Sequence, residues 1–135
     1  MMENTAEIEN NELTPLPSVT FGWELVLDLY DCNKKSISDE KTIKNFARDL
    51  CEVIDMKPYG EPYAPYFGEN KEHTKGYSLL QFIETSSIVG HFSESTGAVY
   101  LNIFSCKEYD MNKAENFSKE YFGAKRVRSR FIVRE

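Results

Sequence analysis

Apolar and polar residues alternate in several short segments of this chain, which is the pattern of half-buried β-strands. "FGWELVLDLYDC" at 21–32 alternates and then breaks at the polar turn "DCNKK". "ESTG" at 94–97 is a turn signal between two further alternating segments. The strands expected after the first are "YSLLQFIET" at 77–85, "SSIVGHF" at 86–92, "AVYLNIFSC" at 98–106 and "KRVRSRFIV" at 125–133.

Two other segments follow helical spacing. Ser38 is the expected N-cap of the first helix, which ends before Pro58. Asp110 is the expected N-cap of the second helix, and Gly123 is placed to end it. The expected apolar faces consist of Ile43, Phe46, Ala47, Leu50, Cys51 and Ile54 in the first helix, and of Ala114, Phe117 and Tyr121 in the second.

The order of these elements predicts the fold. The Pro- and Tyr-rich stretch 59–67 suits an irregular edge strand, and "GENKEHTKG" at 68–76 suits an exposed loop. The order is then β-α-β-β-β-β-α-β, in which short turns imply antiparallel pairing. We therefore predict the α+β class: a two-layer sandwich with an antiparallel sheet and two helices on one face. Residues 21–135 form a single domain, and residues 1–20, with four glutamates and no basic residue, form a flexible acidic tail.

Composition narrows the possible partners. A net charge of −6 and a pI near 5.0 argue against nucleic acid or an anionic membrane as the main partner. The basic run "KRVRSR" at 125–130 is interpreted as a charged edge strand rather than a phosphate site. No signal peptide or membrane span is expected. Three cysteines without a CxxC pair and two scattered histidines predict no metal site, and we expect a cytoplasmic protein with free thiols.

Reactive side chains gather in and around the segment "QFIETSSIVGHF" at 81–92. Ser86 and His91 lie within it, Ser78 precedes it and Cys106 ends the next expected strand. A hairpin that turns at 94–97 predicts that His91 and Cys106 lie in nearby rows. Strand serines and histidines are commonly structural, and a free cysteine usually acts as a small hydrophobe. The residues alone therefore leave structural and catalytic roles open, because neither a nucleophile elbow nor an orienting acid is evident.

The chain resembles the small prokaryotic-type S-adenosylmethionine decarboxylase proenzymes over most of its length, from about Phe21 to Arg134. "LVLDLYDC" is similar to the family's first strand, which ends in "DLYGC", and "GYSLLQFIETSS" is similar to "GVSGVVVIAESH". "HFSE" stands where "HTWPE" is usual, "LNIFSC" where "VDIFTC" is usual, and "AKRVRSRFIVR" is similar to the closing strand. The ungapped spacing from Ser78 through Ser86 and His91 to Cys106 matches the family's spacing.

The resemblance implies self-cleavage between Thr85 and Ser86. The Ser86 hydroxyl would attack the Thr85 carbonyl, and β-elimination would give a β chain of 1–85 and an α chain of 86–135. The α chain would begin with a pyruvoyl group derived from Ser86, which forms a Schiff base with the substrate amine, so that no external cofactor is needed. In the family's terms, Ser78 and His91 assist processing, and Cys106 returns a proton to the substrate carbon.

The substrate pocket departs from the family's pattern. The family's carboxylate, suited to ribose hydroxyls, stands four residues after the histidine, where this chain has Ser95 with Glu94 one place earlier. A shift by one residue turns a strand side chain to the other face unless a bulge corrects it. We predict that distortion at "ESTG" lets Glu94 reach the substrate, and that Phe67 or Tyr66 provides an aromatic platform for adenine.

Three functions stay open at this point. The first is a pyruvoyl-dependent S-adenosylmethionine decarboxylase, a carboxy-lyase that supplies the aminopropyl donor for spermidine synthesis. The second keeps this chemistry with ornithine or arginine as substrate, and the third is an unprocessed, non-catalytic homologue. The resemblance and the aromatic-rich uncovered sheet face predict a homodimer of processed αβ units, with active sites near the interface.

Overall fold

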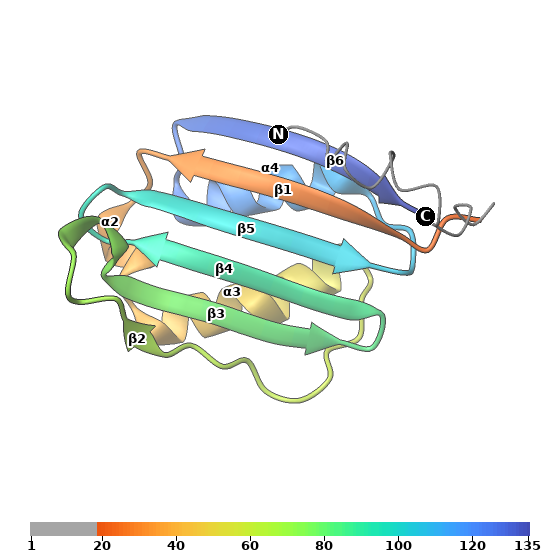
Figure 1. Cartoon of the computed structure of the whole chain (residues 1–135), viewed down its shortest axis with the longest axis horizontal. Helices are drawn as coiled ribbons and strands as arrows, with labels where there is room; N and C mark the ends of the chain where they lie inside the picture. The colour runs from red at the N-terminus through yellow and green to blue at the C-terminus, as the bar shows by residue number, and fades with distance from the viewer. Residues whose placement is uncertain (1–18) are drawn as a thin grey trace, which may run out of the picture.

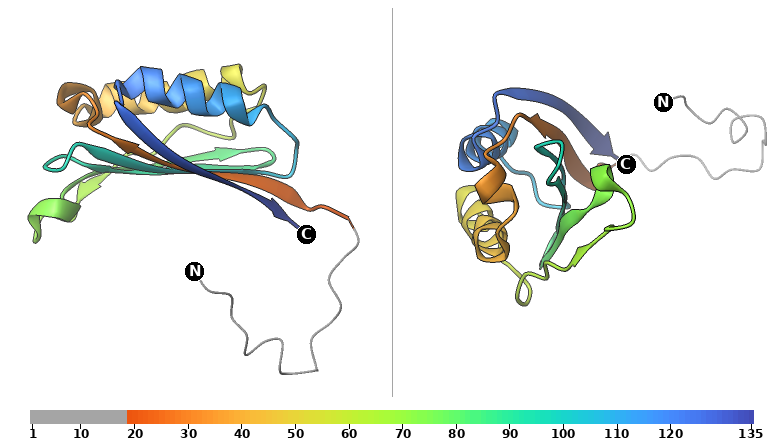
Figure 2. Two further views of the ribbon diagram at one scale, coloured as in Figure 1. Left: turned by 90° about the horizontal axis from the view of Figure 1, so that it is seen from above. Right: turned by 90° about the vertical axis from the view of Figure 1, so that its left-hand side faces the viewer.

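The computed structural model describes residues 19–135 as a six-stranded sheet with two long helices on one face (Figures 1 and 2). The strands are β1 (Gly22–Tyr30), β2 (Tyr66–Phe67), β3 (Gly76–Ile83), β4 (Ser86–Ser93), β5 (Ala98–Ser105) and β6 (Arg126–Arg134). The helical elements are α2 (Lys34–Ile37), α3 (Glu40–Val53), α4 (Met111–Phe122) and the 3-10 turn η1 (Glu72–Thr74). The predicted α+β sandwich is confirmed, while the predicted acidic tail lies outside the described residues except for 19 and 20.

The sheet is antiparallel throughout, with the strand order β2-β3-β4-β5-β1-β6. The basic run at 125–130 falls on β6, which is an edge strand, as predicted. The opposite edge is short and irregular: β2 has two residues, and isolated bridges join Pro58 to Ile83 and Tyr63 to Leu80. The consecutive strands β3, β4 and β5 therefore lie side by side and carry the candidate site.

The core lies between the sheet and the helices, because alternate strand residues point toward α3 and α4. The predicted apolar face of α3 is confirmed, with all six of its residues buried. The α4 face differs from the prediction, since Ala114, Ser118 and Phe122 are its buried residues. Phe122 contacts the sheet through Phe92, with ring centroids 5.3 Å apart. Phe117 and Tyr121 are half-buried and flank the ring of Phe46 on α3.

Short-range hydrogen bonds define the helix ends. The N-cap of α3 is Asp39 and not Ser38 as predicted, since the Asp39 carboxylate accepts the Thr42 N–H at 2.9 Å. Ser38 instead ends α2, a one-turn helix in the segment that was expected to be a turn. For α4 both predictions are confirmed: Asp110 caps its start, and Gly123, with φ of 65°, ends it in the left-handed conformation that glycine adopts without strain.

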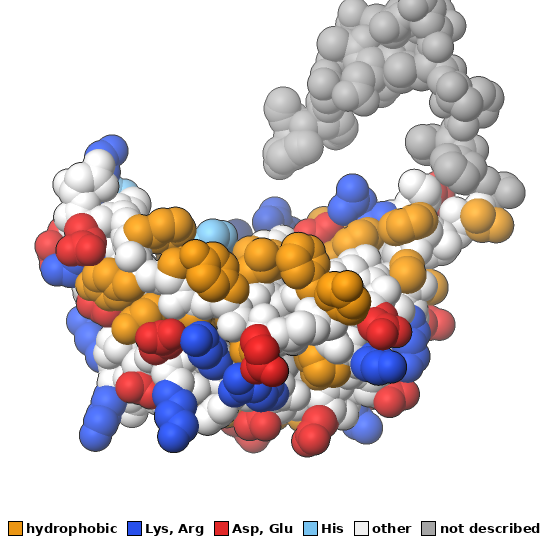
Figure 3. All heavy atoms as spheres, turned by 90° about the horizontal axis from the view of Figure 1, so that it is seen from below, with side chains coloured by type: hydrophobic (Ala, Val, Ile, Leu, Met, Phe, Trp, Pro, Cys, Tyr) orange, Lys and Arg blue, Asp and Glu red, His pale blue; other side chains and the backbone are white. Residues whose placement is uncertain are grey.

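The second face of the sheet is left uncovered by the helices in both views of Figure 2. In Figure 3, which looks at the β2–β3 edge, hydrophobic side chains line the upper rim, while charged ones predominate below, toward the helices. The exposed aromatic residues on or beside β2 and β3 include Tyr59, Tyr63, Tyr66, Phe67 and Phe82. In the described part of the chain, no helix has both the length and the apolar character needed to cross a membrane.

Candidate active site

The predicted cleavage position lies in the turn of Glu84 and Thr85 that joins β3 to β4. The Thr85 carbonyl oxygen accepts a hydrogen bond from the backbone N–H of Cys106 at 2.9 Å. Ser86 has a φ of 154°, in a region that is essentially reserved for glycine, and such residues store about 1–3 kcal/mol of backbone strain. A polarised carbonyl and a strained serine therefore meet at the same peptide bond.

The side chain of Thr85 is held as firmly as its carbonyl. The hydroxyl of Ser105, which is completely buried, donates to Thr85 Oγ1 at 2.8 Å and accepts the Lys107 N–H at 2.9 Å. Thr85 Oγ1 in turn donates to the Met56 sulfur at 3.3 Å. Ser105 and Met56 were not predicted as site residues, although Ser105 directly precedes Cys106. We call Thr85, Ser86, Ser105 and Cys106 the turn cluster.

Only one of the cysteines has an accessible thiol. Burial raises the pKa of Cys51 to about 11, and burial together with Asp31 raises the pKa of Cys32 to about 11. Both thiols stay protonated at neutral pH and lie in the core. Cys106 is exposed at the end of β5, so it alone among the three can meet a substrate.

Ser78 and His91 form a second group. They are direct partners in the β3–β4 register, and Ser78 Oγ lies 3.1 Å from His91 Nδ1. Both border a cavity of about 460 Å³, the face cavity, on the uncovered side of the sheet. Its lining residues are Phe67, Gly68, His73, Thr74, Tyr77, Ser78, His91, Phe92, Ser93, Thr96 and Tyr100.

The face cavity is lined by aromatic and polar side chains, including the rings of His73 and His91. No Asp or Glu is among its lining residues in the described part of the chain. Desolvation, reinforced by Tyr30 and Asp28, raises the pKa of Tyr100, so its hydroxyl keeps its proton at neutral pH. Phe67 borders the cavity, with 54% of its surface exposed, and its role as an aromatic platform for adenine stays a prediction. The cavity therefore offers aromatic rings and hydrogen-bonding groups but no fixed negative charge.

The turn cluster and the Ser78–His91 pair lie at opposite ends of the β3–β4 hairpin. Ser86 and His91 are separated by five strand steps, which is roughly 16 Å at 3.3 Å per residue. The prediction that His91 and Cys106 lie in nearby rows is wrong, because His91 pairs with Tyr100 whereas Cys106 follows Ser105, the partner of Ser86. Within one chain, the imidazole cannot reach the peptide bond at Ser86.

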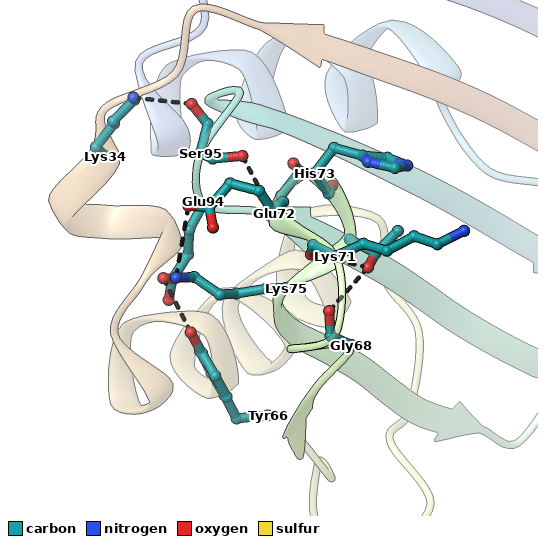
Figure 4. A network of polar contacts seen from close by, with 11 residues as sticks. Lys34, Tyr66, Gly68, Lys71, Glu72, His73, Lys75, Glu94 and Ser95 are labelled. Atoms are coloured by element: carbon teal, nitrogen blue, oxygen red, sulfur yellow. Dashed lines mark hydrogen bonds and ion pairs between the residues drawn. The ribbon is translucent and has the colours of Figure 1, made fainter.

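Glu94 is directed away from the face cavity. Its carboxylate accepts a hydrogen bond from the Tyr66 hydroxyl at 3.1 Å, and Figure 4 shows these two side chains pointing toward each other. Desolvation and this contact with Glu94 raise the pKa of Tyr66. Neither residue lines the cavity. The turn at 94–97 thus leaves Glu94 on the side that strand alternation favours, and Tyr66 is not an aromatic platform there.

Comparison with known proteins identifies the family of this chain. The profile described as "S-adenosylmethionine decarboxylase" matches residues 23–135, which is most of the chain. The chain belongs to the S-adenosylmethionine decarboxylase family. The predicted family and its enzyme class, a decarboxylase, are thereby confirmed.

The similar proteins within this family share about a quarter of their residues with this chain. S-adenosylmethionine decarboxylase proenzymes from Clostridium botulinum strains Langeland and Loch Maree are 26% and 25% identical over 114 residues, covering 84% of this chain and 93% of theirs. The crystal structure of the adenosylmethionine decarboxylase from Aquifex aeolicus superposes with a TM-score of 0.71 at 16% identity, covering 85% of this chain and 91% of that one. This likeness supports the fold alone.

The relatives are named proenzymes, which raises the question of whether this chain suits a prosthetic group made from its own backbone. The residues present fit such a group at Ser86. The hydroxyl needed for attack follows directly on a carbonyl that a backbone N–H already polarises, and the serine conformation is strained. Thr85 fits as well, because its side chain anchors the turn and only its carbonyl would be needed for the reaction.

Proposed function

We propose that this chain is a pyruvoyl-dependent S-adenosylmethionine decarboxylase that cleaves itself between Thr85 and Ser86. The observation that carries the proposal is the hydrogen bond from Cys106 N–H to the Thr85 carbonyl, next to a serine with a φ of 154°. A preorganised N–H stabilises the negative charge that develops on a carbonyl under attack, and one such donor contributes on the order of 10²–10³ in rate. Cleavage also releases the backbone strain at Ser86.

The proposed cleavage proceeds through an ester between Thr85 and the Ser86 side chain. The Ser86 hydroxyl loses its proton and attacks the Thr85 carbonyl carbon, the C–N bond breaks, and the nitrogen takes a proton, so that an ester replaces the amide. A base then removes the Cα proton of Ser86, the Cβ–O bond breaks, and Thr85 leaves as a carboxylate. The elimination leaves a Cα=Cβ double bond, and this enamine becomes an imine when Cβ takes up a proton and the nitrogen loses one. Solvent water then hydrolyses the imine, which releases ammonia and leaves a ketone at the new N-terminus. The base for this elimination must lie within hydrogen-bond reach of Ser86.

The need for a base beside Ser86 suggests that a second copy of the chain supplies it in a homodimer. His91 lies about five strand steps, roughly 16 Å, from Ser86 in its own chain, which excludes direct proton transfer. A two-fold axis across the middle of β4, with two uncovered sheet faces in contact, would bring His91 of one copy to the end of β4 that carries Ser86 in the other, where the proton to be removed is on the backbone Cα. By alternation from Tyr100, Cys106 lies on the same face as His91, and the side chains of His91 and Cys106 are both exposed. The apolar rim in Figure 3 would be buried by such packing.

The substrate follows from the chemistry of the face cavity. Ornithine or arginine brings a strongly hydrated ammonium or guanidinium group, which needs an acidic partner when it is desolvated. The cavity's described lining supplies no carboxylate, whereas Phe67 and Tyr100 supply aromatic rings suited to a weakly hydrated sulfonium. S-adenosylmethionine is therefore favoured, and its decarboxylated product would supply the aminopropyl donor for spermidine synthesis. When formed, the pyruvoyl group at residue 86 supplies the carbonyl that accepts electrons as CO₂ leaves.

Processed protein is expected to release labelled CO₂ from carboxyl-labelled S-adenosylmethionine and not from ornithine or arginine. Each substrate is offered separately, and radioactivity in the trapped CO₂ is counted. The Ser86→Ala protein is the control, because it cannot form the prosthetic group. Release from ornithine or arginine but not from S-adenosylmethionine would overturn the proposed substrate while leaving the chemistry in place.

Replacing Cys106 with alanine is expected to impair turnover far more than self-cleavage. The backbone N–H that polarises the Thr85 carbonyl remains in the variant, whereas the thiol proton donor is lost. Loss of a positioned proton donor costs on the order of 10²–10⁴ in rate. Fragment formation by intact mass and product formation by chromatography separate the two effects. An unchanged decarboxylation rate with an unchanged product would remove Cys106 from the site.

A further inference from the structure

We propose that His73, on the η1 turn, contacts the ribose hydroxyls of the substrate in place of the carboxylate that Glu94 was expected to supply. This inference rests on the proposed function and names a residue that determines substrate affinity. His73 borders the face cavity together with Phe67, Ser78 and His91. Glu94 faces Tyr66 instead, and Figure 4 shows the His73 ring pointing in a different direction from the Glu94 carboxylate.

Three hydroxyl groups that line the cavity already donate hydrogen bonds within the protein. The Thr74 hydroxyl donates to the Gly68 carbonyl at 2.8 Å, and the Thr96 hydroxyl donates to Ser93 Oγ at 2.7 Å. Ser93 Oγ donates to the His73 carbonyl at 2.8 Å. The His73 ring has no hydrogen bond to any described residue. A neutral imidazole offers one donor and one acceptor, which matches a pair of neighbouring hydroxyls.

The residues that depart from the family's pattern hold His73 in place. Ser95, which stands where the family has its carboxylate, donates to the Glu72 carbonyl at 2.9 Å. The Glu94 N–H donates to the Lys75 carbonyl at 3.3 Å. Together with the Ser93 bond, these contacts attach the segment 93–95 to both ends of η1. The segment 93–95, which has a serine where the family has its carboxylate, therefore helps to position an imidazole at the face cavity.

The turn is also constrained from its C-terminal side. Gly76 has a φ of 150°, and a Cβ atom there would collide with the Phe92 carbonyl oxygen. Only glycine allows β3 to start this close to β4. The backbone of η1 is thus fixed on both sides, and His73 is presented to the cavity by a defined turn.

The kinetic test compares three full-length variants. His73→Phe keeps a ring but loses both hydrogen bonds, so KM for S-adenosylmethionine should rise roughly five- to tenfold with kcat and self-cleavage unchanged. His73→Gln retains a donor and an acceptor and should restore much of the affinity. Glu94→Gln is the matched control and should leave KM unchanged. An unchanged KM in His73→Phe, or an equal rise in Glu94→Gln, would overturn the inference.

A binding test separates this inference from the proposed function. Adenosine and 2′,3′-dideoxyadenosine are titrated calorimetrically into the Ser86→Ala protein with and without His73→Phe. Adenosine should bind roughly five- to tenfold more tightly than the dideoxy compound when His73 is present, and about equally when it is absent. Loss of the same factor for both nucleosides, or no binding of either, would overturn the contact. If the wild type releases no CO₂ but the hydroxyl preference depends on His73, the proposed function fails and the contact stands.

Discussion

Ser86→Ala is expected to stay a single chain of 135 residues while the wild-type protein separates into fragments 1–85 and 86–135. The alanine has no oxygen to attack the Thr85 carbonyl, and the ester that precedes chain breakage cannot form. The carbonyl, its Cys106 N–H donor and the Ser105 anchor are unchanged, so the effect isolates the missing hydroxyl. Denaturing mass spectrometry after a long incubation measures it, and the wild-type C-terminal fragment should resist N-terminal sequencing.

Ser87→Ala is the matched control for this experiment. Ser87 is the next residue of β4 and also carries a hydroxyl, but it pairs with Phe82 and Phe104 and does not follow the polarised carbonyl. It should cleave like the wild type. Cleavage before residue 87 in the wild type would mean that the register is wrong by one residue. A wild-type chain that remains whole would favour the non-catalytic homologue instead.

Mixing two uncut variants is expected to restore cleavage. The Ser86→Ala chain keeps His91, and the His91→Ala chain keeps Ser86, so a dimer with shared sites contains one intact pair of groups. Alone, His91→Ala should be slowed on the order of 10²–10⁴ by loss of its base. Co-expressed in equal amounts, about half of the His91→Ala chains pair with the other variant and should be cut. The masses of the fragments identify which chain was cleaved.

The control replaces the first partner with the double variant Ser86→Ala, His91→Ala, which brings no imidazole and should restore nothing. Sedimentation of the wild type should show a dimer at micromolar concentration. A monomer would remove the second copy from the site. Dimers that form mixed pairs without any cleavage would show that His91 is not the base, and the base would then have to lie beside Ser86 itself.

Local patterns in the sequence predicted most of the fold. The alternation at 21–32 and 98–106 corresponds to β1 and β5, because one face of each strand is buried under helices. Helical spacing identified α3, and Asp110 and Gly123 marked both ends of α4. The short helix α2 was missed because one turn carries no periodicity. The buried face of α4 also differs from the prediction, since the aromatic rings of Phe117 and Tyr121 are only partly buried at the edge of the core.

The candidate residues were found by their spacing, but spacing does not report distance through the sheet. Ser78, Ser86, His91 and Cys106 are close in sequence, and the predicted hairpin places His91 and Cys106 in nearby rows. The strand register separates them into two groups, because an extended chain covers about 3.3 Å per residue. The sequence pattern predicts only that His73 lies in an exposed loop. Its place at the cavity depends on hydrogen bonds from Ser93 and Ser95, which lie twenty or more positions further along the chain.

The sequence by itself determined the α+β class, the order of strands and helices, the family and the identity of the serine at the proposed cleavage point, since each of these rests on local pattern or on residue spacing. Tertiary structure alone decided which groups meet. It set the Cys106 N–H against the Thr85 carbonyl, turned Glu94 toward Tyr66 and brought His73 to the cavity. The physical reason is that register and turn geometry fix these contacts, and both arise from packing between segments distant in the chain.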